Sequence, residues 1–183
     1  GPDNDLYPVI LSGDLNNNDN TNIDDTEPTR QDNTYRVVTA NPTGVFTNHS
    51  YVLTDVAIAD GNANGSGADG RSAALDAGRT VSIRLERLHV YDHSQTSGSL
   101  GVVTADGSGG SGPTAIQLTD SVIERTRGNS AVLLGLSNNP TNETDVEITN
   151  VIVREHQGNT GIILGGSTNQ LTNVLATNVT ATR

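Results

Sequence analysis

The sequence feature that most constrains the fold is a repeat of about 30 residues. Residues 145–166 read DVEITNVIVREHQGNTGIILGG, and residues 114–135 read TAIQLTDSVIERTRGNSAVLLG, with apolar and polar positions in the same order. Self-similarity at a fixed period of 20–50 residues is typical of solenoids, propellers and repeat arrays. The repeat therefore predicts a stack of equivalent units.

The repeat can be aligned along the chain on two apolar positions. The first position is occupied in turn by Leu53, Leu85, Leu118, Ile148 and Leu171. The second, five residues later, is occupied by Ile58, Val90, Ile123, Val153 and Ala176. Apolar and polar residues alternate around both positions, which is the period of a β-strand, and the alternation breaks at a polar pair between them. We therefore expect two short strands that meet at a bend.

A third apolar run, usually beside glycine, completes each unit, at 37–39, 73–75, 100–103, 131–134 and 162–164. Three strands and three corners describe one coil of a right-handed parallel β-helix, in which coils stack about 4.8 Å apart. We predict an all-β single domain over residues 1–183, with five to six coils of about 30 residues and three strands per coil. Residues 1–33 form an acidic segment with a partial coil at 7–13 and a polar Asn/Asp loop, and 34–183 form five repeat coils.

Charged residues near the predicted corners alternate in sign from coil to coil. Stacking would place Glu124 beside Arg154, Arg125 beside Glu155, Asp92 beside Arg125, and Arg87 between Asp55 and Asp120. Opposite charges on neighbouring strands contribute about 0.2–1 kcal/mol, and like charges are destabilising. The alternation supports this alignment, and the alternative interpretation is scattered surface charge.

Composition excludes several classes of partner. The net charge is −11, and all ten cations are arginine. Such a surface repels nucleic acid and anionic lipid headgroups. No stretch is apolar enough to span a bilayer, so we expect neither nucleic-acid binding nor membrane insertion. The absence of Cys, Met and Trp removes the side chains most prone to oxidation and favours an extracellular location.

The strongest local motif is DLNNNDNTNIDD at residues 14–25. Alternate oxygen ligands would come from Asp14, Asn16, Asn18, Asn20, Asn22 and Asp25, a spacing that can surround Ca²⁺. The opening GDLNNN resembles dockerin-type calcium loops, although Asp19 stands where such a loop has its glycine. The motif predicts a calcium site, and the alternative is a solvated Asn/Asp insertion.

A second hypothesis is a carbohydrate-active or carbohydrate-binding β-helix, similar to polysaccharide lyases and hydrolases. Such enzymes place carboxylates and a cation in one groove, where they act as acid and base. The candidate residues are Asp92 and His93, with His89, Arg87 or Arg125 on stacked coils, and the later pair Glu155 and His156. The same residues also fit a charge ladder at strand ends, and only 3% of the residues are aromatic, which leaves little surface for stacking sugars.

The units LTDVAIADGNANG, LTDSVIERTRGNSA and ITNVIVREHQGNTG resemble the repeats of bacterial right-handed parallel β-helix surface proteins, including the polymorphic-outer-membrane-protein-like ones. The resemblance covers about residues 7–183 and carries no active site. It implies export, a place at the cell surface or in the extracellular matrix, and an adhesive or scaffolding role. Partners would be glycans or other surface proteins.

The repeat pattern runs to the C-terminal residues LTNVLATNVTATR, and a strand pattern begins near Tyr7. Open ends of a β-helix expose unpaired backbone and core side chains. We expect other copies of the chain to cover these ends by head-to-tail stacking, and the alternative is a segment of a longer β-helix. Glycosylation sequons at Asn48, Asn64, Asn142 and Asn178 matter only in a host that glycosylates.

Overall fold

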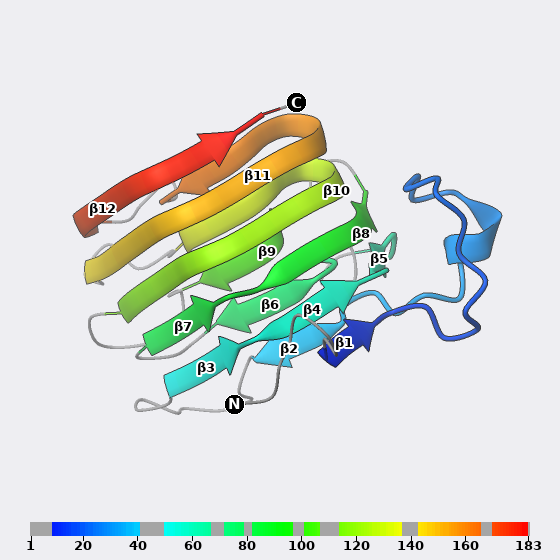
Figure 1. The fold of residues 1–183 in the computed structure, drawn as a ribbon, viewed down its shortest axis with the longest axis horizontal. Helices are drawn as coiled ribbons and strands as arrows, with labels where there is room; N and C mark the ends of the chain where they lie inside the picture. Colours follow the sequence, from blue (N-terminus) through cyan, green and yellow to red (C-terminus); the bar gives the residue numbers. More distant parts are fainter. Residues whose placement is uncertain are drawn as a thin grey trace.

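A computed structural model describes residues 9–40, 50–66, 72–78, 82–96, 101–106, 114–136, 143–165 and 170–182. Apart from one turn of 3₁₀ helix, η1 (Pro28–Arg30), the described elements are strands. They are β1 (Val9–Ser12), β2 (Val38–Ala40), β3 (Ser50–Thr54), β4 (Val56–Ala59), β5 (Asn62–Ala63), β6 (Leu75–Gly78), β7 (Ser82–Glu86), β8 (His89–Gln95), β9 (Gly101–Asp106), β10 (Thr114–Leu136), β11 (Glu143–Leu164) and β12 (Gln170–Ala181). All strand pairs are parallel and stack from β1 to β12 (Figure 1), which confirms the predicted all-β parallel solenoid.

The strands form three faces. The first face stacks β3, β7, β10, β11 and β12. The second stacks β1, β4, β8, β10, β11 and β12. The third stacks β2, β6, β9, β10 and β11. The strands β10 and β11 bend twice and pass through all three faces, as one coil of a solenoid must.

The coils at the two ends are incomplete in the described part of the chain. Strands β1 and β2 cover the second and third faces, and β12 covers the first and second. Complete passes over all three faces run from β3 to β11. The number of complete coils is therefore smaller than the five to six predicted.

The predicted register is confirmed through β11 and wrong in β12. Leu53, Leu85, Leu118 and Ile148 pair in sequence. The next residue in that column is Ala176, whereas Leu171 pairs with Thr144. Correspondingly, the second column, through Val153, ends at Ala181 rather than at Ala176. The error arose because LTNV at 171–174 and ATNV at 176–179 are nearly identical. The pairing shifts by one residue after Thr144, and the first corner of β12 therefore falls in the second of these tetrapeptides.

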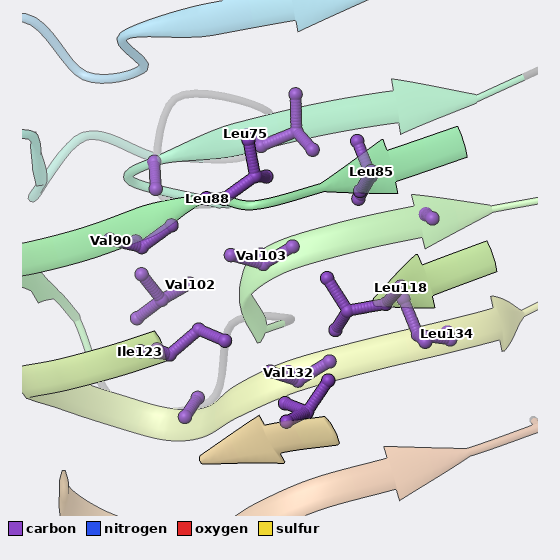
Figure 2. Close-up of a cluster of buried hydrophobic side chains, with 14 of the residues drawn as sticks. Leu75, Leu85, Leu88, Val90, Val102, Val103, Leu118, Ile123, Val132 and Leu134 are labelled. Atoms are coloured by element: carbon purple, nitrogen blue, oxygen red, sulfur yellow. The ribbon is translucent and has the colours of Figure 1, made fainter. Parts of the chain in front are cut away.

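The core lies between the three faces and consists of aliphatic side chains in columns. Figure 2 shows Leu85 and Leu118 from the first face, Ile123 from the second and Leu134 from the third directed into this space. These four side chains are at most 2% exposed. Full burial of one aliphatic side chain contributes about 1.5–3 kcal/mol, so repetition of small apolar contacts stabilises the stack.

Two corners use left-handed backbone at residues other than glycine. The first corner, between the first and second faces, has φ from 49° to 60° at Asp55, Arg87, Asp120, Asn150 and Asn178. The second corner, between the second and third faces, has φ from 45° to 61° at Asp60, Asp92, Arg125 and Glu155. Asn and Asp tolerate this conformation best, whereas other residues pay roughly 1–2 kcal/mol. The first corner is the polar break that the sequence showed.

Replacement of Ile123 by Ala should destabilise the fold much more than replacement of Ile152 by Ala. Both residues lie on the second face in neighbouring coils, but Ile123 is 0% exposed and Ile152 is 41% exposed. We expect the buried truncation to lower the free energy of unfolding by about 2–5 kcal/mol, and the exposed one by roughly 0.5 kcal/mol. Urea unfolding followed by circular dichroism measures both, and equal losses would contradict the assignment of inward and outward columns.

Candidate functional site

The segment between β1 and β2, residues 13–36, forms an arm that packs against the side of the solenoid (Figure 1). At its start, the Gly13 amide donates to the Ala59 carbonyl over 2.9 Å. At its end, the Thr34 carbonyl accepts from the Asn62 amide over 3.0 Å. Both ends of the arm are therefore fixed to the coil that holds β4 and β5, beside the second corner.

A buried guanidinium holds the arm to the second corner. Arg30 is 1% exposed, and its Nη1 lies 3.2 Å from the Asp19 carboxylate. Its Nη2 donates to the Asp92 carbonyl. Asn33 donates to the same Asp19 carboxylate over 2.7 Å and to the Asp60 carbonyl over 2.6 Å. Burial raises the pKa of Asp19, and the Asn33 and Arg30 contacts oppose that shift.

Further polar contacts connect the arm to three successive coils. The Asn62 side chain donates to the Arg30 carbonyl over 2.8 Å in the β5 coil. In the β8 coil, the Thr96 hydroxyl donates to the Asp25 carboxylate over 3.3 Å. In the β10 coil, Arg127 forms an ion pair with Asp24. The sequence pattern does not predict these contacts, although Arg30 is the single cation beside seven acids in residues 1–30, which is a signal for a buried ion pair.

The predicted calcium ligands lie in this arm, and most of their described contacts are with nearby backbone amides. The Asp14 carboxylate accepts from the amides of Asn16, Asn18 and Asp19 at 3.1–3.3 Å. Partial burial raises the pKa of Asp14, and these amide bonds together lower it below its ordinary value.

The side-chain amides of Asn20 and Asn22 donate to Glu27 over 2.9 and 2.6 Å, while Asp25 contacts Thr96 on the solenoid. Among the described residues, no three Asp, Glu or His side chains are arranged to hold a metal ion. The calcium loop stays a prediction.

The structure separates Asp92 from His93 of the enzyme hypothesis. Asp92 lies at the second corner, where Arg125 donates to both of its carboxylate oxygens over 2.8 and 3.1 Å. His93 follows the corner and is 0% exposed. Its Nδ1 accepts from the Gly61 amide over 2.9 Å, and its Nε2 donates to the Ile58 carbonyl over 3.0 Å. Burial lowers the pKa of His93 to about 4.

The later acid–histidine pair repeats this separation two coils further along the stack, because Thr126 pairs with both His93 and His156. Glu155 is exposed at the corner, and His156 is buried with its Nδ1 2.8 Å from the Thr126 hydroxyl. In each pair the acid lies on the outside and the imidazole on the inside. Asp92 and His93 therefore lie on opposite sides of the strand, whereas Glu155 and His156 both line one cavity beside the corner.

The outside of the second face carries a charged cluster around Glu124, which is 5% exposed. Its carboxylate accepts from His89 at 2.8 Å, Arg154 at 2.6 Å and Arg125 at 3.2 Å. Burial raises the pKa of Glu124, but the bonds from His89 and Arg154 bring it below its ordinary value. The Tyr91 ring lies 4.7 Å from the His89 ring, and the Arg125 guanidinium lies 5.4 Å from the Tyr91 ring centre.

This cluster confirms the predicted pairs Glu124–Arg154 and Asp92–Arg125. At the first corner, Arg87 donates to both oxygens of Asp55, and this bond lowers the pKa of Asp55 to about 2. These contacts pair charges of successive coils, which is the ladder arrangement that the alignment predicted.

Three cavities surround the second corner of β11. One of about 550 Å³ is lined by residues 155–158, and one of about 200 Å³ also touches Ala181 and Thr182 near the end of β12. A third, of about 220 Å³, lies between Asp25 of the arm and the residues Arg127 and Gln157, which follow the second corner in β10 and β11. The arm covers the same corner in the coils below, and the cavities begin where its described contacts end.

Among the described residues, core-facing side chains are more exposed at both ends of the stack than inside it. At the β12 end, Val174 is 46% exposed, whereas Val146, its partner in β11, is 2% exposed. At the β3 end, Tyr51 and Leu53 are half-buried, whereas their partners Ile83 and Leu85 in β7 are at most 2% exposed. Among the described strands, β12 pairs with β11 alone and β3 with β7 alone. In the described part of the chain, both ends therefore combine exposed apolar side chains with a strand edge that has no described partner.

No protein-family model matches this chain, and no curated protein or solved structure matches it significantly. In the part of the chain that the structure describes, no helix has the length and hydropathy to cross a membrane. Of the predicted sequons, Asn64 and Asn178 lie in described segments, and Asn48 and Asn142 lie outside them. The class that the fold defines is a parallel β-solenoid.

Replacement of His93 by Gln should flatten the dependence of stability on pH. A Gln side chain can accept from the Gly61 amide and donate to the Ile58 carbonyl, but it does not titrate. The pKa of His93 is about 4 in the folded protein, against an ordinary 6.5, so the unfolded chain binds more protons between these values. The stability that neutral His93 contributes is complete above pH 6.5 and is lost as the pH falls to 4.

Over this range, we expect the unmodified protein to lose about 3 kcal/mol more than H93Q. Urea unfolding at pH 7, 5.5 and 4 measures the difference. Asp19 and Asp60, whose pKa values burial raises, act in the opposite direction in both proteins and cancel in the comparison. Parallel pH profiles would show that His93 is not held neutral.

Replacement of Arg30 by Met should release the arm. The change leaves the Asp19 carboxylate, 8% exposed, without its cation, and loss of one partner of a buried pair costs about 3–5 kcal/mol. We expect proteases to cut residues 14–33 faster in R30M. Arg84→Met is the matched control because the Arg84 side chain is 54% exposed. Partial protection in the double variant R30M/D19N would identify the unpaired carboxylate as the cause.

Proposed function

We propose that this chain is a non-enzymatic structural β-solenoid that assembles end to end outside the cell. The observation that carries the proposal is the exposure of core-facing columns at both ends of the stack. Val174 continues a column whose next member, Val146, is almost fully buried. A further coil in the same position would bury Val174 in the same way.

The strand edges at these ends support the same conclusion. A parallel edge presents unpaired amide and carbonyl groups, and an added strand satisfies them through main-chain hydrogen bonds. The two ends of a solenoid differ, so contact between them is heterologous. A heterologous contact that does not close into a ring produces a filament.

The charged residues favour a structural role over catalysis. Asp92 is held by Arg125, Glu124 by three cationic or imidazole donors, and His93 lies in the core with both ring nitrogens bonded. The absence of Cys, Met and Trp, the side chains most prone to oxidation, supports an extracellular location. Turnover of an acidic polysaccharide, with or without calcium, that Asp92→Asn abolishes would contradict the non-enzymatic assignment.

Replacement of Val174 by Asp should prevent assembly. Sedimentation of the unmodified chain should give species at multiples of 19.1 kDa that grow with concentration. V174D places a carboxylate at the open end of the core, where burial against another copy costs several kcal/mol, and should sediment as a monomer. Ile152→Asp is the matched control, because it makes the same kind of change at an outward position within the stack. A monomer at all concentrations of the unmodified chain would overturn the proposal.

A further inference from the structure

We infer that β12 of one copy pairs in parallel with β3 of the next, in the register that places Leu175 beside Val52. The inference rests on the proposed end-to-end assembly and identifies the strands and residues that meet. Its basis is the sequence of side chains in each column of the first face.

The outward column at the centre of the first face has an unusual pattern. In order along the stack it contains Val52, Arg84, Gln117, Glu147 and Leu175. The three middle positions are polar or charged, as expected for a face in water. The two end positions are apolar, and Val52 and Leu175 are 62% and 56% exposed. Stacking one copy on the next would bring these two side chains together and remove apolar surface from water at both ends.

The neighbouring inward columns agree with this register. Val174 of one copy would lie beside Tyr51 of the next, and Ala176 beside Leu53, so both core columns continue without interruption. At the first corner, Asn178 would meet Asp55. Inside the stack, the corresponding Asn150 amide donates to Asp120 over 2.8 Å. The Asn178 amide donates one N–H to Asn150 over 3.0 Å, and its second N–H can donate to the carboxylate of the next copy.

The third face fits the same step. It ends at β11 in one copy and begins at β2 in the next, so Ile162 and Leu164 would lie beside Val38 and Ala40. All four are partly buried and already pack against the core. On the second face, residues 179–181 of β12 and strand β1 of the next copy would occupy the same position in the stack. One of these two short segments must therefore detach from the second face when the copies assemble.

A competing register keeps the second face intact and places Ile10 beside Thr180. That register pairs the three residues 179–181, whereas the register proposed pairs the five of β3 and the three of β2. The proposed register therefore satisfies more main-chain groups and buries the two exposed apolar residues of the first face.

Paired cysteines test the register, because the chain contains none of its own. Neighbouring parallel strands lie about 4.8 Å apart, within the Cα separation of roughly 4.4–6.8 Å that a disulfide spans. The variant V52C/L175C should form, under mild oxidation, a ladder of covalent dimers, trimers and larger species that a reductant collapses. Within one copy the two positions are four strand spacings apart, too far for an internal bond. Both side chains are exposed, and circular dichroism checks that the variant folds.

The control R84C/L175C moves one cysteine one coil inward in the same column, where the partner would be about 9.6 Å away, and should stay monomeric on a non-reducing gel. The variant I10C/T180C tests the competing register and should cross-link at least tenfold less than V52C/L175C. Dominant cross-linking of I10C/T180C would overturn the inference but leave end-to-end assembly in place. Dominant cross-linking of L175C alone would overturn it in favour of contact between two β12 ends. Absence of assembly in sedimentation overturns both the inference and the proposed function, whereas assembly without the 52–175 cross-link overturns the inference alone.

Discussion

In-register parallel stacking is the constraint on which the rest of this structure depends. Each residue has a neighbour above and below at the distance of one strand spacing, so every column must be compatible from coil to coil. Aliphatic residues fill the inward columns because they repeat without leaving polar groups unpaired. The narrow interior explains why the chain folds with one Phe and no Trp.

The same constraint turns the corners into sites of electrostatic pairing. Two corners hold non-glycine residues in left-handed conformations, and the cost recurs in every coil. Stacking places these residues beside one another, and bonds such as Arg87 to Asp55 and Arg125 to Asp92 offset part of that cost. Several charges that the sequence offered as candidates for catalysis therefore also stabilise the turns that carry them.

The sequence predicts what repeats and misses what does not. Period-two alternation located the columns through Ile148, and alternation of charge identified the Glu124–Arg154 pair. The predicted register of the last coil was wrong because two similar tetrapeptides occur in 171–179. The repeat pattern does not give the length of the connection between β11 and β12, so it could not decide which tetrapeptide forms the corner. The packing of the arm rests on contacts such as Arg127 with Asp24, 103 residues apart, which no local pattern reveals. The burial of His93 was not predicted, because the alternation of apolar and polar residues does not show which side chains point into the core after a corner.

The arm changes how this solenoid responds to strain. A simple stack interacts only between adjacent coils and can open one coil at a time from either end. Here one segment leaves the first coil and contacts the β5, β8 and β10 coils, so displacement of any of them loosens the same buried Arg30–Asp19 pair. A force along the axis of the solenoid would therefore act on these three coils together rather than on one coil at a time. The described polar contacts of the arm end at the β10 coil, so β11 and β12, at the end that would meet the next copy, depend on stacking between adjacent coils.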